Sequence, residues 1–137
     1  MINWKKVAYD DELGEFERTA REFSTADNDI KTNIATLKLK YKTAKLKTLS
    51  LSDWKRLRNT DSYMTETIES AQKSIKRNGE PRNLISIINE FITGSVRAPI
   101  ALQLSDKSLY LVAGNTRLMV ARFLDIKPRI VVVETDW

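Results

Sequence analysis

The stretch that decides the fold is Leu109-Tyr110-Leu111-Val112-Ala113-Gly114-Asn115-Thr116-Arg117-Leu118-Met119-Val120-Ala121-Arg122-Phe123-Leu124. An apolar, partly aromatic run ends at Ala113 and is typical of a strand. The apolar residues from Leu118 to Leu124 recur at helical spacing and predict a helix. Between the two lies Gly114-Asn115-Thr116-Arg117, which we call the Gly114 loop. The pattern therefore predicts a strand, a tight turn and a helix.

The residue types of the Gly114 loop are those that bind anions. Gly114 can adopt backbone conformations closed to residues with a Cβ, so a ligand can approach the main chain. Asn115 and Thr116 are good N-cap residues, and the N–H groups of a first helical turn lie beside them. Those donors, the positive end of the helix dipole and the guanidinium of Arg117 predict a phosphate site. The alternative is that the turn only connects two elements and that Arg117 is solvated.

The flanking segments predict an α+β fold with an α/β-like core. Pro99-Ile100 opens a strand that ends near Leu104, and the β-branched run from Arg129 to Glu134 predicts a strand buried on both faces. We expect a mixed sheet of three strands with helices packed on it. Upstream, the spacing predicts one helix capped by Asp61-Ser62 with Met64 and Ile68 on its apolar face. A second helix, from Pro81 to Gly94, is apolar enough to lie wholly in the core.

The first half of the chain differs from the second in the distribution of its charges. We predict that residues 1–60 form a helical and basic extension and that residues 61–137 form the core. Residues 10–30 are acidic and predict an amphipathic helix, which the turn and cap residues Ser24-Thr25-Ala26-Asp27-Asn28-Asp29 then break. Residues 31–58 are basic, and their periodicity leaves open whether they begin with a strand or a helix.

The basic segment is a candidate nucleic-acid contact. Its cations could follow a phosphate backbone, and Tyr41 and Trp54 could stack on bases. The alternative is that the lysines solvate one face and pair with the acidic helix before them. The candidate contacts are Lys38, Lys40, Lys42, Lys45, Lys47, Lys55, Arg56 and Arg58.

Composition excludes several kinds of chemistry. The 137 residues include neither Cys nor His, which removes thiol catalysis, thiolate metal sites and the usual base near neutral pH. No metal site built from several ligands is predicted. No apolar run approaches the ~20 residues of a membrane span, so we expect no membrane partner. The first residues carry no apolar signal region, and we expect a cytoplasmic protein.

The segments from Pro99-Ile100 through the Gly114 loop to Arg129-Val133 resemble the core of the ParB/sulfiredoxin-like superfamily. Ala113-Gly114-Asn115-Thr116-Arg117-Leu118 also resembles a motif of bacteriophage proteins. The resemblance implies that Gly114, Asn115, Thr116 and Arg117 bind the phosphates of a nucleotide, which is ATP, ADP or CTP. Resembling proteins often place a Pro-Arg pair before the core, so Arg82 is expected to add a phosphate contact. The absence of Cys and His excludes the thiol-repair chemistry of sulfiredoxins.

Three functions follow as hypotheses. The first is a nucleotide-binding ParB-like protein that acts with DNA, as a phage regulatory or DNA-processing factor. The second is a small phosphotransferase or NTPase, with Mg²⁺ and Glu80 as the carboxylate that serves as base or metal ligand. The third is an interaction module in which the N-terminal half binds a partner protein. The sequence does not indicate the oligomeric state.

Overall fold

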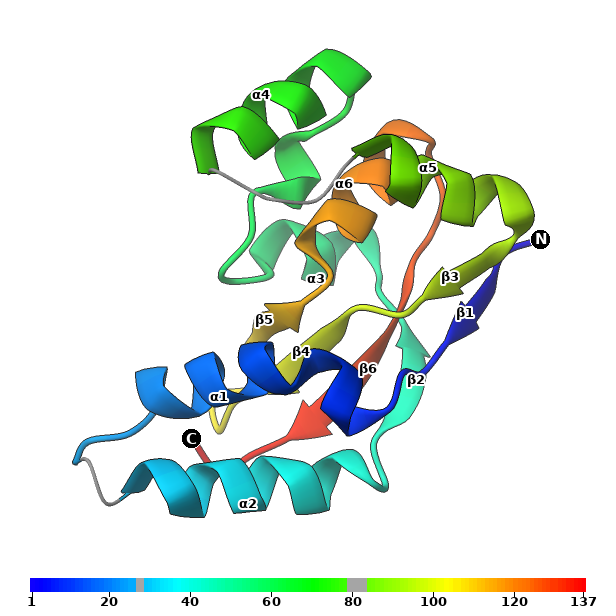
Figure 1. Cartoon of the computed structure of the whole chain (residues 1–137). Helices are drawn as coiled ribbons and strands as arrows, with labels where there is room; N and C mark the ends of the chain where they lie inside the picture. The colour runs from blue at the N-terminus through cyan, green and yellow to red at the C-terminus, as the bar shows by residue number, and fades with distance from the viewer. Residues whose placement is uncertain (27–28, 79–83) are drawn as a thin grey trace.

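The computed structural model describes residues 1–26, 29–78 and 84–137. The predicted α+β class is confirmed, because the described residues form six α-helices, a four-stranded mixed sheet and a two-stranded sheet. In Figure 1, α1 and α2 lie at the lower end of the molecule and α4, α5 and α6 at the upper end. The elements, in chain order, are β1 (Asn3–Lys5), the 3-10 helix η1 (Tyr9–Glu12), α1 (Leu13–Glu22), α2 (Asp29–Tyr41), β2 (Lys45–Thr48), α3 (Leu51–Arg56), the 3-10 helix η2 (Ser62–Met64), α4 (Ile68–Asn78), α5 (Leu84–Thr93), β3 (Ser95–Arg97), β4 (Ile100–Gln103), β5 (Leu109–Ala113), α6 (Asn115–Phe123) and β6 (Arg129–Glu134).

The main sheet has the strand order β2-β6-β4-β5. β4 and β5 form an antiparallel hairpin, and α6 then carries the chain back so that β6 lies parallel to β4, with Val131 opposite Ile100. β2 pairs antiparallel with the other side of β6, with Lys45 opposite Val132. The prediction of a three-stranded sheet is therefore wrong by one strand, and the added strand comes from the basic segment.

The start of the basic segment is a helix, α2, because Leu37 and Tyr41 lie one turn apart and are both buried. The alternation of apolar residues and lysines over 37–42 does not produce a strand here. Lys6 caps the end of the helix, since its Nζ donates to the carbonyl oxygens of Tyr41 at 2.6 Å and Ala44 at 2.8 Å.

The second sheet pairs β1 with β3 in parallel, with Trp4 opposite Val96. The Trp4 ring meets Phe91 edge to face, with centroids 5.6 Å apart. Residues 1–60 thus give one strand to each sheet.

The core lies between the main sheet and the helices on it. α1 contacts β5, α2 contacts β6, and both α4 and α5 contact α6. The sheet and α6 supply most of the fully buried side chains, which include Ile100, Ala101, Leu102, Leu118, Met119, Val120, Ile130, Val131 and Val133.

Several predicted helix limits need correction. The acidic helix begins with a 3-10 turn before α1, and α1 ends at Glu22, just before the break expected from Ser24. The helix expected from Asp61-Ser62 is a 3-10 turn, and α4 begins only at Ile68, which leaves Met64 exposed. The second helix is not wholly core, because Ile85 and Ile92 are 65% and 75% exposed.

Candidate functional site

The Gly114 loop joins β5 to α6 as the sequence predicts, but the residue at the N-cap is Gly114 and not Asn115 or Thr116. Gly114 has φ +100°, a region that favours glycine. A Cβ added to Gly114 would lie 2.6 Å from Cβ of Pro99. Glycine is therefore required here to let Pro99, which directly precedes β4, pack against the end of β5.

Arg117 does not point into solvent. It is 1% exposed, and its guanidinium forms a two-point ion pair with Glu90 of α5, with Nε 3.3 Å from Oε1 and Nη2 3.1 Å from Oε2. Arg97 also donates to Glu90, through Nη2 at 3.3 Å from Oε2. One carboxylate therefore holds two guanidinium groups, of which Arg117 is the buried one.

The Glu90 carboxyl is ionised by this arrangement. Burial by itself raises its pKa, but the hydrogen bonds from Arg97 and Arg117 and the charge of Arg117 outweigh burial and bring the pKa below the usual range. Glu90 is the one charged residue in the apolar run of α5. That isolated acid is the signal from which a buried partner of Arg117 could have been suspected.

A polar cluster borders the other side of the loop. The Thr60 hydroxyl donates to Oδ1 of Asn115 at 2.5 Å, and the Trp54 indole N–H donates to the Ser62 hydroxyl at 2.9 Å. The Ser74 hydroxyl donates to Oδ2 of Asp61 at 2.5 Å. Sequence reasoning missed these neighbours, because they come from residues 54–74, forty or more residues before the loop. Glu80 and Arg82, the other predicted members of the site, lie outside the described residues.

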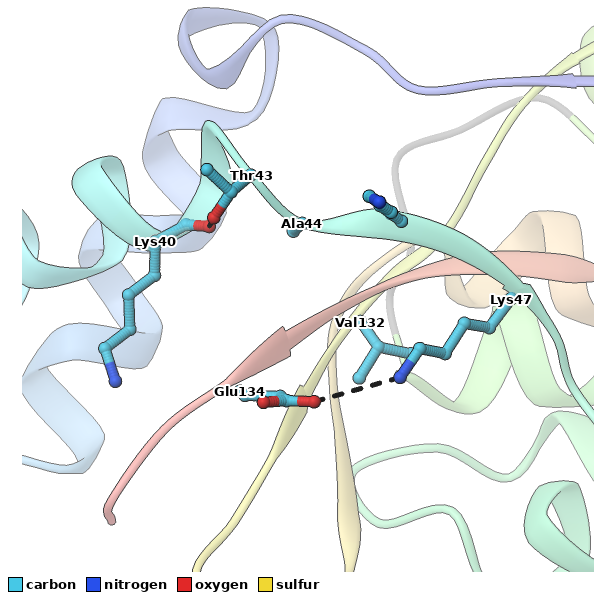
Figure 2. A pocket seen from close by; sticks show the side chains of 7 residues that line it. Lys40, Thr43, Ala44, Lys47, Val132 and Glu134 are labelled. Carbon is cyan, nitrogen blue, oxygen red and sulfur yellow. Dashed lines mark hydrogen bonds and ion pairs between the residues drawn. The ribbon is translucent and has the colours of Figure 1, made fainter.

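The structure brings three of the predicted basic residues together in one hollow. Lys40, Lys45 and Lys47 line a cavity of about 400 Å³, with Thr43, Ala44, Val132 and Glu134 as the other lining residues. Figure 2 shows this cavity, where Lys40 extends from α2 and Lys47 points toward Glu134 of β6. Nζ of Lys47 is 3.9 Å from Oε1 of Glu134. We call this hollow the basic groove.

The groove lies at the edge of the main sheet. Lys45 and Lys47 are two residues apart on β2, so both side chains leave the same face of the strand. β2 is the outermost strand on its side of the sheet. Both lysines are exposed, whereas the Val132 side chain below them is buried.

The remaining basic residues lie elsewhere. Arg58 lies at the opposite edge of the sheet, where its main chain bonds to Leu109 and Leu111 of β5 and its guanidinium is 5.8 Å from the centre of the Tyr110 ring. Arg56 pairs with Asp53 on α3. The other predicted contacts are exposed but do not line the groove, and they are Lys38, Lys42 and Lys55.

Both structural assumptions made about the basic segment require correction. Tyr41 and Trp54 are 3% and 2% exposed, so neither ring can stack on a base. The Tyr41 hydroxyl instead donates to the carbonyl oxygen of Val7. Within the described residues, none of the ion pairs joins a lysine of 31–58 to an acid of 10–22, so the expected pairing with the acidic helix is not seen.

In residues 1–26, 29–78 and 84–137, no three acidic side chains come together as metal ligands would. None of the helices described is long and apolar enough to cross a membrane.

The fold and these two sites define an α+β protein with a mixed sheet, a buried Arg–Glu pair beside a glycine turn and a lysine-lined edge. Comparison with protein-family models, curated proteins and solved structures finds no match to this chain.

Proposed function

We propose that this chain is a DNA-binding protein that contacts phosphates through the basic groove. The observation that carries the proposal is the gathering of Lys40, Lys45 and Lys47 around one hollow of about 400 Å³. Ammonium groups are strong phosphate ligands, and neutralising phosphates releases counterions from the nucleic acid, which favours binding. The chain also carries a net charge of +5, which favours encounter with a polyanion.

The groove suits an anion better than the Gly114 loop does. The guanidinium of Arg117 already has a carboxylate partner and is buried, whereas Lys45 and Lys47 are exposed. Among the described residues that line the groove, Glu134 alone opposes the three lysines, and its contact with Lys47 is a long one between exposed groups. Such a pair contributes little, roughly 0–1 kcal/mol, so a phosphate can replace it.

The test is fluorescence anisotropy of a labelled DNA duplex as a function of salt. Three lysine contacts predict that log K falls against log salt with a slope of about −2.7, or roughly 40-fold between about 50 and 200 mM. The variant K45Q/K47Q should lower the slope to about −0.9, because each phosphate contact contributes about 0.9.

The matched control is K73Q/K76Q, which removes the same charge from exposed lysines of α4. This variant should bind like the unaltered protein. Equal weakening by both variants would show that net charge alone matters, and a chain that binds no duplex at low salt would show that the proposal is wrong.

A second candidate function is nucleotide-phosphate binding at the Gly114 loop, which the ParB/sulfiredoxin-like resemblance implies. It is favoured by the fixed turn at Gly114, which places the positive end of α6 directly after β5. Because Arg117 is paired with Glu90, the helix N-terminus and not the guanidinium would provide most of the attraction. Arg82 stays a predicted phosphate contact, and Glu80 a predicted base or Mg²⁺ ligand.

Thermal unfolding in the presence of ATP, ADP or CTP, with and without Mg²⁺, tests this candidate. A nucleotide at 100 times its Kd should stabilise the folded state by about 2.7 kcal/mol. The variant R82Q should reduce that gain in stability if Arg82 contacts a phosphate. In a separate assay of phosphate release, E80Q should remove any Mg²⁺-dependent turnover. No shift in Tm with any of the three nucleotides would eliminate the candidate, while the proposal for the basic groove would stand.

A further inference from the structure

The aromatic residues of this chain are buried or half-buried. Every Trp, Tyr and Phe falls within residues 1–26, 29–78 and 84–137, and five of these eleven rings are buried while six are half-buried. Tyr41, next to Lys40 of the groove, and Trp54 are almost completely buried and have hydrogen-bond partners for their polar atoms. Trp137, three residues after Glu134, is half-buried and stacks on Phe23 with centroids 5.3 Å apart. Proteins that bind single strands depend on aromatic rings, which gain roughly 1–3 kcal/mol for each stacked base. This source of affinity is absent from the groove.

The cations of the groove are also of the kind that contacts phosphates. All three are lysines, whose ammonium groups act as point charges, and none is an arginine that could bind a guanine edge at two points. Because each residue advances a strand by ~3.3 Å, Lys45 and Lys47 lie about 6.6 Å apart along β2. This spacing is close to that of successive phosphates along one DNA strand. The groove therefore matches a backbone, and its described lining residues include no arginine for a two-point contact with a guanine edge.

We infer that the basic groove takes the phosphate backbone of a duplex in preference to a single strand, and that it does so without regard to base sequence. This inference rests on the proposed function. Without stacking, affinity comes from charge, and a duplex carries the higher charge density. Each phosphate contact contributes about 0.9 to the salt slope on a duplex and about 0.7 on a single strand. For three contacts at about 0.1 M salt, this difference makes the duplex roughly fourfold tighter.

The experiment compares two labelled probes with the whole chain: a DNA duplex of two helical turns and one of its strands, chosen so that it does not fold on itself. Anisotropy at about 0.1 M salt should give a Kd for the duplex that is roughly fourfold lower. A second duplex of unrelated sequence should give the same Kd within about twofold, because contacts to phosphates carry no sequence information. The K45Q/K47Q variant should reduce the preference for the duplex, and K73Q/K76Q should keep it.

A second readout separates stacking from charge. Trp4 and Trp54 are buried, so saturation with either probe should leave most of the tryptophan fluorescence unchanged. Tighter binding to the single strand, or strong quenching by it, would overturn this inference while leaving the groove as a DNA site. A Kd that differs tenfold between the two duplexes would show that the protein does recognise base sequence. Failure of both probes to bind would overturn the proposed function itself.

Discussion

The carboxylate of Glu90 on α5 holds the guanidinium of Arg117 on α6 at two points, with nitrogen–oxygen distances of 3.3 and 3.1 Å. The arginine is buried, so the ion pair ties two helices together in a setting where an uncompensated charge is costly. Arg117 is thus part of what holds α5 against α6, whatever the Gly114 loop binds.

Breaking this pair should destabilise the protein. Glu90→Gln leaves the Arg117 charge buried without its carboxylate, and removal of one partner from a buried pair costs about 3–5 kcal/mol. We expect a loss of about 3 kcal/mol in urea unfolding. Arg117→Met keeps much of the volume and removes the charge, so E90Q/R117M should be more stable than the sum of the two single losses implies. Additive losses would contradict the coupling.

The same carboxylate predicts a pH dependence. The folded-state pKa of Glu90 is lowered from 4.5, so its contribution to stability is fully present above about that pH. It is lost as the pH falls through the lower, folded-state pKa. Urea unfolding between about pH 6 and pH 3 should therefore show a smaller loss of stability for E90Q than for the unaltered chain. Glu69→Gln, at an exposed position on α4, is the control and should behave like the unaltered chain.

Two glycines offer a matched pair of substitutions. Gly114→Ala places a Cβ 2.6 Å from Cβ of Pro99 and forces a left-handed backbone on alanine, and we expect a loss of about 2–4 kcal/mol. Gly14→Ala lies in the first turn of α1 with no atom within 4 Å of the added carbon, so it should stabilise the protein by about 0.4–1 kcal/mol. Thermal unfolding measures both. A neutral Gly114→Ala would contradict the close packing of the turn.

Glu134 is the one acid among the residues that line the basic groove, and it should weaken DNA binding. Glu134→Gln frees Lys47 from its partner and removes a negative charge, so affinity for a duplex should rise. An exposed pair of this kind is worth about 0.2–1 kcal/mol, which corresponds to a gain of roughly 1.4- to 5-fold. Glu69→Gln makes the same charge change on α4 and should have no effect on Kd. Weaker binding of E134Q would place the DNA elsewhere.

The buried Tyr41 predicts how the protein behaves at high pH. Burial, with the nearby charges of Glu12 and Asp11, raises the pKa of Tyr41 to about 12. The unfolded chain ionises near pH 10, so stability is lost as the pH rises from about 10 to about 12. Tyr41→Phe should cost about 1 kcal/mol at neutral pH through the lost bond to Val7, and its stability should fall less steeply above pH 10. An unchanged alkaline slope would contradict this.

The parts of the fold that could be predicted from the sequence are those with local causes. The run that ends at Ala113, the glycine and the helical spacing after it are contiguous, and they form β5, the turn and α6 as expected. β2 could not be recognised in this way. It is four residues long, mostly exposed and rich in lysine, and it is a strand because it pairs with β6, more than eighty residues away.

The candidate site also combines features with local causes, which could be predicted, and features that depend on distant residues, which could not. The turn at Gly114 was predictable because a glycine between a strand and a helix acts through its own backbone. The ion pair of Arg117 could not be predicted, because its partner Glu90 comes from α5 and lies outside the stretch 109–124. The groove required the pairing of β2 with β6, which brings Glu134 beside Lys47. The nucleic-acid hypothesis also required Tyr41 to be a surface ring, although its position on α2 makes it core.

The position of β6 in the sheet affects how the chain can fold during synthesis. β6 separates β2 from β4, yet the ribosome makes it after every other strand described here. The β4–β5 hairpin can close early because its two strands are neighbours in the chain. β2, by contrast, emerges without any partner and must keep its open backbone groups in water until residues 129–134 arrive. A stalled or shortened nascent chain would therefore expose the inner edges of both β2 and β4 to other chains.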